Sequence, residues 1–244
     1  MIQIKILKEQ NLKGYTILET FPGIGLVGPM AGSYMIEKLG MEYIGHMESD
    51  QFPPIATIHH SIPMFPARLY KSDKMKLLLF MSEFTISPLL VNQLANEVLA
   101  FARKYGADKL VSVGGMPSQK PTDTIYIASS NGAVLKKAQK MGIKTIEEGV
   151  VSGVSAALLI NAAEFKIPAF DILVEVNPSI TDPKYAEIAI EGLNKVLGID
   201  IDLSELDKEA KIVEAKIREM LSKVKNTHEQ YASSSESTGP SMYA

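Results

Sequence analysis

Two patterns of hydrophobic positions alternate along most of the chain. Short runs that are apolar at every position, or at every second one, predict strands, and segments of roughly 10–18 residues with a helical repeat predict helices. The run "MKLLLFMSE" (75–83) is almost continuously apolar, which is typical of a strand covered on both faces. The patterns predict strands at 1–8, 14–21, 42–48, 55–61, 67–71, 75–83, 109–115, 143–146 and 169–176, and helices at 29–40, 88–105, 131–141, 152–165 and 183–197.

This order of elements predicts an α/β fold for residues 1–200. Strands that alternate with helices favour a mainly parallel, doubly wound sheet with helices on both faces. We therefore expect a three-layer Rossmann-like sandwich of the phosphorylase/hydrolase-like kind. Four prolines between 53 and 66 indicate edges and turns there rather than central strands. The pairs Ser87-Pro88 and Asp182-Pro183 have the form of helix N-caps followed by proline.

The last forty residues follow a different pattern. An apolar seam spaced 4, 3, 4, 3 and 4 residues apart predicts a charged amphipathic helix within residues 201–231. The helix either pairs with other helices or lies on its own domain, and the seam fits both arrangements. The segment 232–244, "ASSSESTGPSMYA", holds too few apolar residues to fold and is expected to be a flexible tether. The seam consists of Leu206, Ala210, Val213, Ile217, Met220 and Val224.

Composition narrows the class of protein. The chain has 244 residues, of which 46% are hydrophobic, so a sizeable core is expected. It contains no cysteine, which excludes disulfides, thiolate zinc sites and cysteine nucleophiles. The net charge of −3 and the lack of a basic tract argue against nucleic acid as a partner. No apolar run has the ~18 residues of a membrane span, and the charged N-terminus is no signal peptide, so we expect a cytoplasmic protein without a membrane partner.

The stretch "FPGIGLVGPM" contains a glycine motif that two interpretations fit. Gly23, Gly25 and Gly28 spell G-x-G-x-x-G between a strand and a helix, and Glu48 lies twenty residues on, as in a dinucleotide site. However, Pro29 removes an amide N–H at the helix start, where a phosphate would bind. The alternative is that the glycines permit positive φ and close packing of strand and helix. The pair Gly114–Gly115 could line a pocket at the same edge of the sheet or form a turn.

Other candidate chemistry is sparse. His46, Glu48, Asp50 and the pair His59–His60 are close in sequence, but they lack the spacing of a metal site. Glu83, at the end of a buried strand, is a candidate general base without a nameable nucleophile. We therefore expect no metal, no cofactor and no enzymatic activity.

The chain ends in three residues that suit a docking plug. Met242 can fill an apolar notch adaptably, and Tyr243 adds a large rigid ring with a hydroxyl group. The carboxylate of Ala244 can pair with a lysine in a backbone-lined pocket. The alternative is a frayed end without function, as is common for termini.

This ending, together with "FPGIGLVGPMAGSYMIEKLG", "ESDQFPP" and "VSVGGMP", resembles the proteasome assembly chaperone family in its archaeal form. The resemblance covers most of residues 10–200 and includes the glycine turn, which that family does not use for nucleotide chemistry. It implies an ATP-independent protein that binds the α-ring of the proteasome core particle through a hydrophobic–tyrosine–any (HbYX) tail. Met242, Tyr243 and the Ala244 carboxylate would then be the docking groups, and a homo-oligomer, with a tetramer favoured, would present them.

Several functions stay open from the sequence. The tail fits help with α-ring assembly as well as opening the gate of the finished particle. A nucleotide- or nucleoside-binding enzyme that uses Gly23–Gly28 is the main alternative. A general holdase for unfolded chains is a third, suggested by the twelve methionines.

Overall fold

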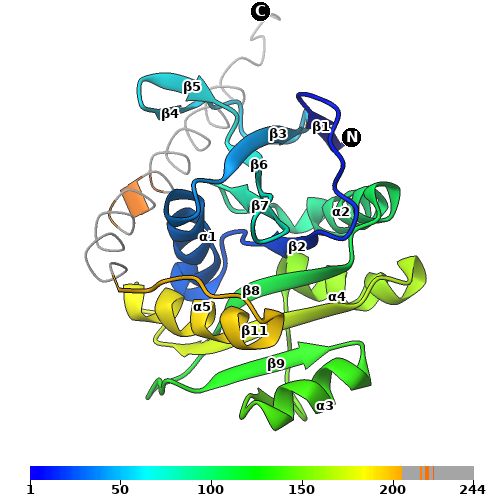
Figure 1. The fold of residues 1–244 in the computed structure, drawn as a ribbon. Coiled ribbons are helices and arrows are strands. Elements are labelled where there is room, and N and C mark those ends of the chain that lie inside the picture. The colour runs from blue at the N-terminus through cyan, green and yellow to red at the C-terminus, as the bar shows by residue number, and fades with distance from the viewer. Residues whose placement is uncertain (205–214, 216–217, 220–221, 223–244) are drawn as a thin grey trace, which may run out of the picture.

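The computed structural model describes residues 1–204, 215, 218, 219 and 222. Its centre is a nine-stranded mixed sheet in the order β1-β3-β6-β7-β2-β8-β11-β9-β10 (Figure 1). The four central strands β7, β2, β8 and β11 run parallel, while β1, β3 and β6 form an antiparallel extension beside β7. The strands are β1 (Gln3–Ile6), β2 (Thr16–Glu19), β3 (Glu42–Glu48), β4 (Thr57–His59), β5 (Ile62–Met64), β6 (Ala67–Ser72), β7 (Leu77–Ser82), β8 (Lys109–Pro117), β9 (Ile125–Ser129), β10 (Lys144–Thr145) and β11 (Ala169–Val176).

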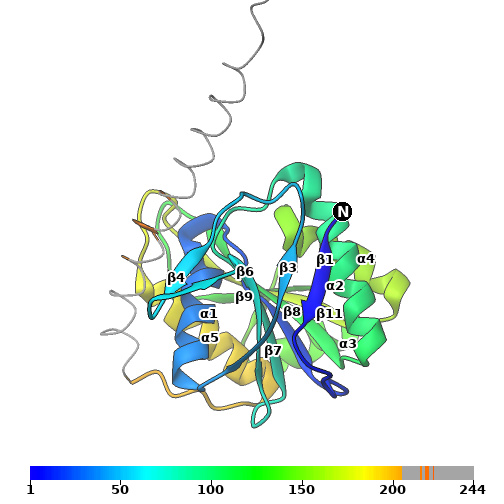
Figure 2. The same cartoon turned by 90° about the horizontal axis from the view of Figure 1, so that it is seen from above.

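Helices cover both faces of the sheet and complete three layers (Figures 1 and 2). Helices α1 and α5 pack together on one face, α2 and α4 pack together on the other, and α3 lies against the β9–β10 edge. The helices are α1 (Val27–Lys38), α2 (Val91–Tyr105), α3 (Gly132–Lys140), α4 (Gly153–Phe165) and α5 (Pro183–Leu197), with short 3₁₀ turns η1 (Ile24–Leu26) and η2 (Pro88–Leu90) before α1 and α2.

Each face of the sheet has its own hydrophobic core, because successive strand residues point to opposite sides. In β2, Leu18 contributes to the core under α1 and α5, whereas Ile17 contributes to the core under α2 and α4. In β8, Val111 contributes to the core under α1 and α5, and Leu110 contributes to the core under α2 and α4. Residues buried on both faces account for the near-continuous apolar runs of the central strands.

Local signals set several helix ends. The side chain of Asp182 accepts a 2.9 Å hydrogen bond from the Lys184 amide, so the cap predicted before α5 is confirmed. Helix α2 ends at Gly106, which has φ +67°. Ser87 precedes the 3₁₀ turn η2, but its side chain makes no capping hydrogen bond.

The predicted α/β fold class is confirmed, and three details differ. The sheet is mixed rather than mainly parallel, because β6 pairs antiparallel with β7 and β9 pairs antiparallel with β11. Strand β9 was not predicted, and the proline-rich region forms the separate hairpin β4–β5. None of the described helices is both long enough and apolar enough to span a bilayer.

Beyond α5 the chain packs back on the body. The Asn194 side chain exchanges two 3.0 Å hydrogen bonds with the backbone of Ile201, which is buried. The hydroxyl of Tyr34 donates to the carbonyl of Asp202 at 2.7 Å, and Lys38 pairs with the Asp202 carboxylate at 3.0 Å. Four further described residues are helical and exposed: Ala215, Arg218, Glu219 and Ser222. The seam from Leu206 to Val224 and the tail at 232–244 lie outside the described residues, so the segments 201–231 and 232–244 remain predictions.

Candidate functional site

The predicted docking residues Met242, Tyr243 and Ala244 lie outside the described residues. The described part of the chain has four other features that could form a functional site. These are the glycine turn, a row of buried polar groups, a hairpin held by a buried arginine, and a depression at the β10 edge.

The glycine turn is pressed against the sheet. A Cβ atom on Gly28 would lie 2.9 Å from the Val113 carbonyl oxygen, and one on Gly115 would overlap the Ile24 carbonyl oxygen. Gly25 has φ +70°, and a Cβ there would lie 3.0 Å from Val176. Backbone carbonyls therefore occupy the space beside Gly28 and Gly115, and the Val176 side chain occupies the space beside Gly25. This close packing supports the architectural interpretation of the motif.

The acidic residue that completed the dinucleotide pattern lies elsewhere. Glu48 ends β3, and β6 and β7 separate that strand from β2, where the glycine turn begins. Its carboxylate pairs with Lys5 and lies 3.5 Å from His46 Nε2. The structure therefore does not bring Glu48 and Gly23–Gly28 together.

Three polar side chains form a row across three parallel strands. Glu19 is in register with Ser112, and Ser112 is in register with Asp171. All three are buried on the α2/α4 face, since they follow Ile17, Leu110 and Ala169 by two residues. This row, Glu19–Ser112–Asp171, crosses the parallel part of the sheet under its helices.

The row is short of hydrogen-bond partners. Glu19 Oε1 accepts from the Phe21 amide at 2.8 Å, but among the described residues Ser112 Oγ and both Asp171 carboxylate oxygens have no partner. Burial raises the pKa of Glu19 to about 7. Burial, with the nearby Glu19 charge, raises the pKa of Asp171 well above its usual value. Burial therefore shifts both acids toward the neutral form in the folded protein.

The hairpin β4–β5 is held to the sheet by a buried ion pair. Arg68 on β6 is 1% exposed, and its guanidinium group binds both carboxylate oxygens of Glu83, at 2.6 and 3.0 Å. The same group donates to Thr57 Oγ1 on β4 and to the Phe65 carbonyl, each at 2.9 Å. His59 Nε2 lies 2.8 Å from Glu83 Oε1. These contacts matter because an isolated two-stranded hairpin is marginally stable in water.

This pairing changes the interpretation of Glu83. Burial alone would raise the pKa of Glu83, but contacts from His59 and Arg68 and the Arg68 charge lower it on balance. The carboxylate is thus a tightly paired anion rather than a poised base. The geometry gives no support to the general-base hypothesis.

The histidines are divided among separate contacts. His46 stacks on Phe65 with ring centroids 3.7 Å apart, and His59 contacts Glu83. His60 is exposed at the hairpin turn with φ +49°. Within residues 1–204 and the four helical residues beyond, no three His, Asp or Glu side chains are grouped as metal ligands.

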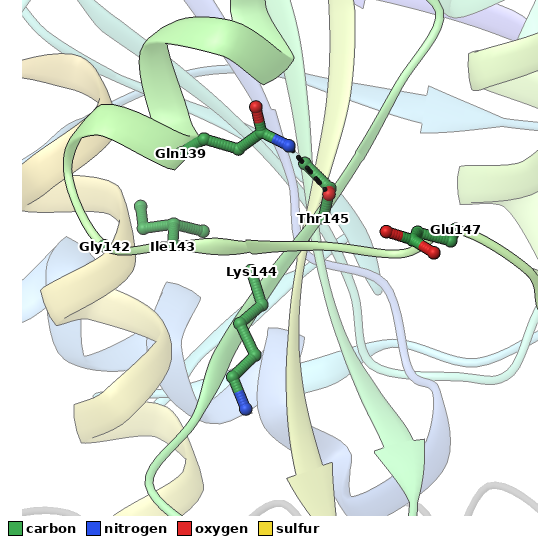
Figure 3. Close-up of a pocket in the computed structure, with 6 residues that line it drawn as sticks. All are labelled: Gln139, Gly142, Ile143, Lys144, Thr145 and Glu147. Carbon is green, nitrogen blue, oxygen red and sulfur yellow. Dashed lines mark hydrogen bonds between the residues drawn. The ribbon is translucent and has the colours of Figure 1, made fainter.

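A shallow depression lies at the β10 edge (Figure 3). It has a volume of about 410 Å³. Gln139 Nε2 donates to Thr145 Oγ1 at 3.2 Å across it. The lining residues are Gln139, Gly142, Ile143, Lys144, Thr145 and Glu147, and none of them was a predicted site residue.

Comparison with known proteins gives the family. The model of the PAC2 family matches residues 17–221. The chain belongs to the PAC2 family. An uncharacterised protein of Methanocaldococcus jannaschii is 33% identical over 204 residues, which cover 84% of each chain.

Solved structures of similar fold include two from Pyrococcus furiosus. PbaA, described as an archaeal homolog of proteasome-assembly chaperone, matches with a TM-score of 0.81 and 26% identity, over 92% of this chain and 99% of its own. PbaB, described as an archaeal proteasome activator, matches with a TM-score of 0.74 and 21% identity, over 89% of this chain and 98% of its own, which shows the fold alone. The resemblance seen in the sequence is thereby confirmed.

Sequence reasoning missed the polar groups that this PAC2 protein buries. Arg68, Glu19 and Asp171 each stand in an otherwise apolar strand: "ARLY", "YTILE" and "AFDILV". A charged residue inside a strand expected to be covered on both faces is itself a signal, because burial of a charge is costly unless the charge is paired or neutralised.

The packing of the glycine turn predicts unequal costs for two Gly→Ala changes. Gly115→Ala should lower the unfolding free energy by about 1–3 kcal/mol, because the methyl group meets the Ile24 carbonyl. Gly23→Ala is the matched control, since no atom lies within 4 Å of its Cβ position and its φ of −142° suits alanine. Urea unfolding measures both, and equal stability of the two variants would contradict the packing argument.

The buried row predicts a pH-dependent gain from Glu19→Gln. The folded wild type keeps a proton on Glu19 that the unfolded chain has lost, so its stability falls as pH rises from 4.5 to about 7 and then levels off. The variant has no such loss, and its amide oxygen can still accept from Phe21. Its advantage over wild type should grow across that window by on the order of 3 kcal/mol. Urea titrations at several pH values test this, with the exposed Glu9→Gln as control; a constant difference would refute it.

The buried ion pair predicts a large effect of Glu83→Gln. Removing one charge leaves Arg68 buried and uncompensated, which should cost on the order of 3–5 kcal/mol. Amide hydrogen exchange over residues 57–64 should accelerate, because the hairpin loses its anchor. Glu42→Gln is the matched control: Glu42 is 61% exposed, and Lys71 keeps its pairing with Asp73, so the change should cost about 1 kcal/mol or less. Similar costs for the two variants would argue against an anchoring role.

Proposed function

We propose that this PAC2 protein is a proteasome assembly chaperone or activator that acts in the cytoplasm without ATP or enzymatic chemistry. The observation that carries the proposal is the match to PbaA, which extends over 92% of this chain and 99% of that one at 26% identity. PbaB, which is described as an archaeal proteasome activator and has the same fold, adds support. The closely packed glycine turn favours a scaffold over a nucleotide enzyme.

The proposed contact with the core particle is the C-terminal plug. Met242 enters an apolar notch, Tyr243 places its ring and hydroxyl group in the same pocket, and the Ala244 carboxylate pairs with a lysine of the α-ring. The pockets lie between adjacent α subunits. Since alanine adds little contact area, two side chains and one charge supply the binding.

One C-terminal plug is expected to bind its pocket weakly, so stable binding requires several plugs to bind at once. Residues 232–244 reach about 43–47 Å when fully extended and about 20 Å on average as a flexible coil. Linked binding events raise avidity by about 10²–10⁴ when the tether spans the sites. A homo-oligomer, for which a tetramer is our working expectation, presents several tethered plugs to a ring with several pockets.

Deletion of Met242–Ala244 tests this mechanism. The truncated protein should lose binding to purified core particles and stimulation of peptide hydrolysis by at least tenfold, while its oligomeric state is unchanged. Deletion of Ser233–Ser235 is the matched control, because it also removes three residues from the tail but keeps the plug at Met242–Ala244. Surface plasmon resonance and a fluorogenic peptide assay measure the two effects. Undiminished binding of the truncation would refute the tail mechanism.

A further inference from the structure

Exposed cations gather at the edge of the sheet where the parallel strands β7, β2, β8 and β11 begin. Because these strands are parallel, the segments that lead into them end at the same edge. The cations come from separate segments, so no basic tract appears in the sequence. We call them the basic edge: Lys8 and Lys13 before β2, Lys74 and Lys76 before β7, Arg103 and Lys104 before β8, and Lys166 before β11.

Contacts between these segments hold the basic edge together. The Thr16 amide donates to the Lys76 carbonyl at 2.8 Å, and the Lys76 ammonium group lies 4.8 Å from the centre of the Tyr15 ring. Gly106 ends α2 directly after the cations of its last turn, and a Cβ atom on it would lie 3.5 Å from Lys13 Cγ. The cations before β7, β2 and β8 therefore belong to one continuous surface.

The charges of this surface are unbalanced. None of the cations of the basic edge makes an ion pair with another of the described residues. In the same segments, Asp73 pairs with Lys71, and Asp108 pairs with Lys109. In a chain with a net charge of −3, this edge therefore has a local excess of positive charge. The acids of these segments that make no described ion pair are Glu9 and Glu164.

Two lysines of the basic edge occupy backbone positions that favour glycine. Lys76 has φ +52° and Lys166 has φ +56°, in the left-handed region that strains a residue with a Cβ atom. Helices α2 and α5 end at this conformation with Gly106 and Gly198, whereas α4 ends with Lys166. The chain thus has lysine where glycine would fit the backbone better, which points to a role for the charge outside folding.

We propose that the basic edge binds an acidic segment of a partner protein, in which several Asp or Glu residues lie close together. Exposed ammonium groups without partners attract carboxylates, and such complementarity steers and orients a partner. The contact goes beyond the proposed function, because it uses none of the C-terminal docking residues.

Protein carboxylates suit this surface better than nucleic acid does. The unpaired Glu9 and Glu164 interrupt the positive charge and would repel a continuous row of phosphates. Arg103 is the one arginine of the basic edge, whereas bidentate recognition of phosphate favours arginine over lysine. The negative net charge of the chain also repels a long polyanion that extends beyond the edge.

Fluorescence anisotropy with a labelled poly-glutamate peptide and the full-length chain tests the proposal. The wild type should bind, and raising the salt concentration from about 50 to about 300 mM should weaken binding about tenfold or more, because salt screens exposed charges. The double variant Lys76→Gly/Lys166→Gly should also bind about tenfold more weakly. Its melting temperature should not fall, because glycine fits the left-handed backbone at both positions. Loss of binding by this variant is therefore not explained by unfolding.

The double variant Lys136→Ala/Lys140→Ala is the matched control. It removes the same two charges from exposed positions of α3, outside the basic edge, and should bind the peptide as the wild type does. Lack of peptide binding by the wild type at low salt, or an equal loss in both variants, would overturn the proposal. Displacement of the peptide by duplex DNA at a lower concentration of charge than by unlabelled poly-glutamate would show that the partner class is wrong.

Discussion

Backbone contact between the turn at residues 21–28 and strand β8 holds the carboxyl end of the parallel sheet together. Gly28 lies under the Val113 carbonyl, and Gly115 lies under the Ile24 carbonyl, so each side of the contact needs a residue without a Cβ atom. The contact sets where α1 begins and therefore how α1 covers the sheet. It lies at the carboxyl end of the parallel strands, the edge where nucleotides bind in many open α/β folds. Backbone occupies the space beside Gly28 and Gly115 there, which favours the architectural interpretation of the glycine motif.

This PAC2 protein compensates the cost of burying charged groups in two different ways. Arg68 and Glu83 are charged and paired, and their bidentate contact joins β6 to the end of β7 and to the hairpin. Glu19 and Asp171 lack such partners, and burial shifts them toward the neutral form. The ion pair fixes the position of the hairpin but requires two charges to be removed from water. The shifted pKa values of the two acids make the stability of the fold depend on pH.

The sequence predicted what depends on local chemistry and missed what depends on strand order. The cap at Asp182, the helix end at Gly106 and the apolar strand at 169–176 are encoded within a few residues, and the structure confirms them. Strand β9 was missed because its five residues follow a polar, proline-containing stretch and its partners, β10 and β11, lie further along the chain. The alignment of Glu19 with Asp171 could not be predicted either, because β8, ninety residues along the chain from β2, lies between them. The docking residues Met242–Ala244, which lie outside the described residues, stay a prediction from sequence chemistry.

The buried polar residues and the glycine motif of the described body make structural contacts. The Arg68–Glu83 pair holds the hairpin β4–β5 in place, and Gly28 and Gly115 allow the glycine turn to pack closely against β8. The exposed surfaces of the helices differ in composition: α5 exposes Lys184 and Lys195, whereas the exposed residues of α2 and α4 are uncharged except near the C-terminal ends of the two helices. The hydroxyl group of Tyr34 and the ammonium group of Lys38 both bind Asp202, so α1 fixes where the chain leaves the described body, beside the α1/α5 layer.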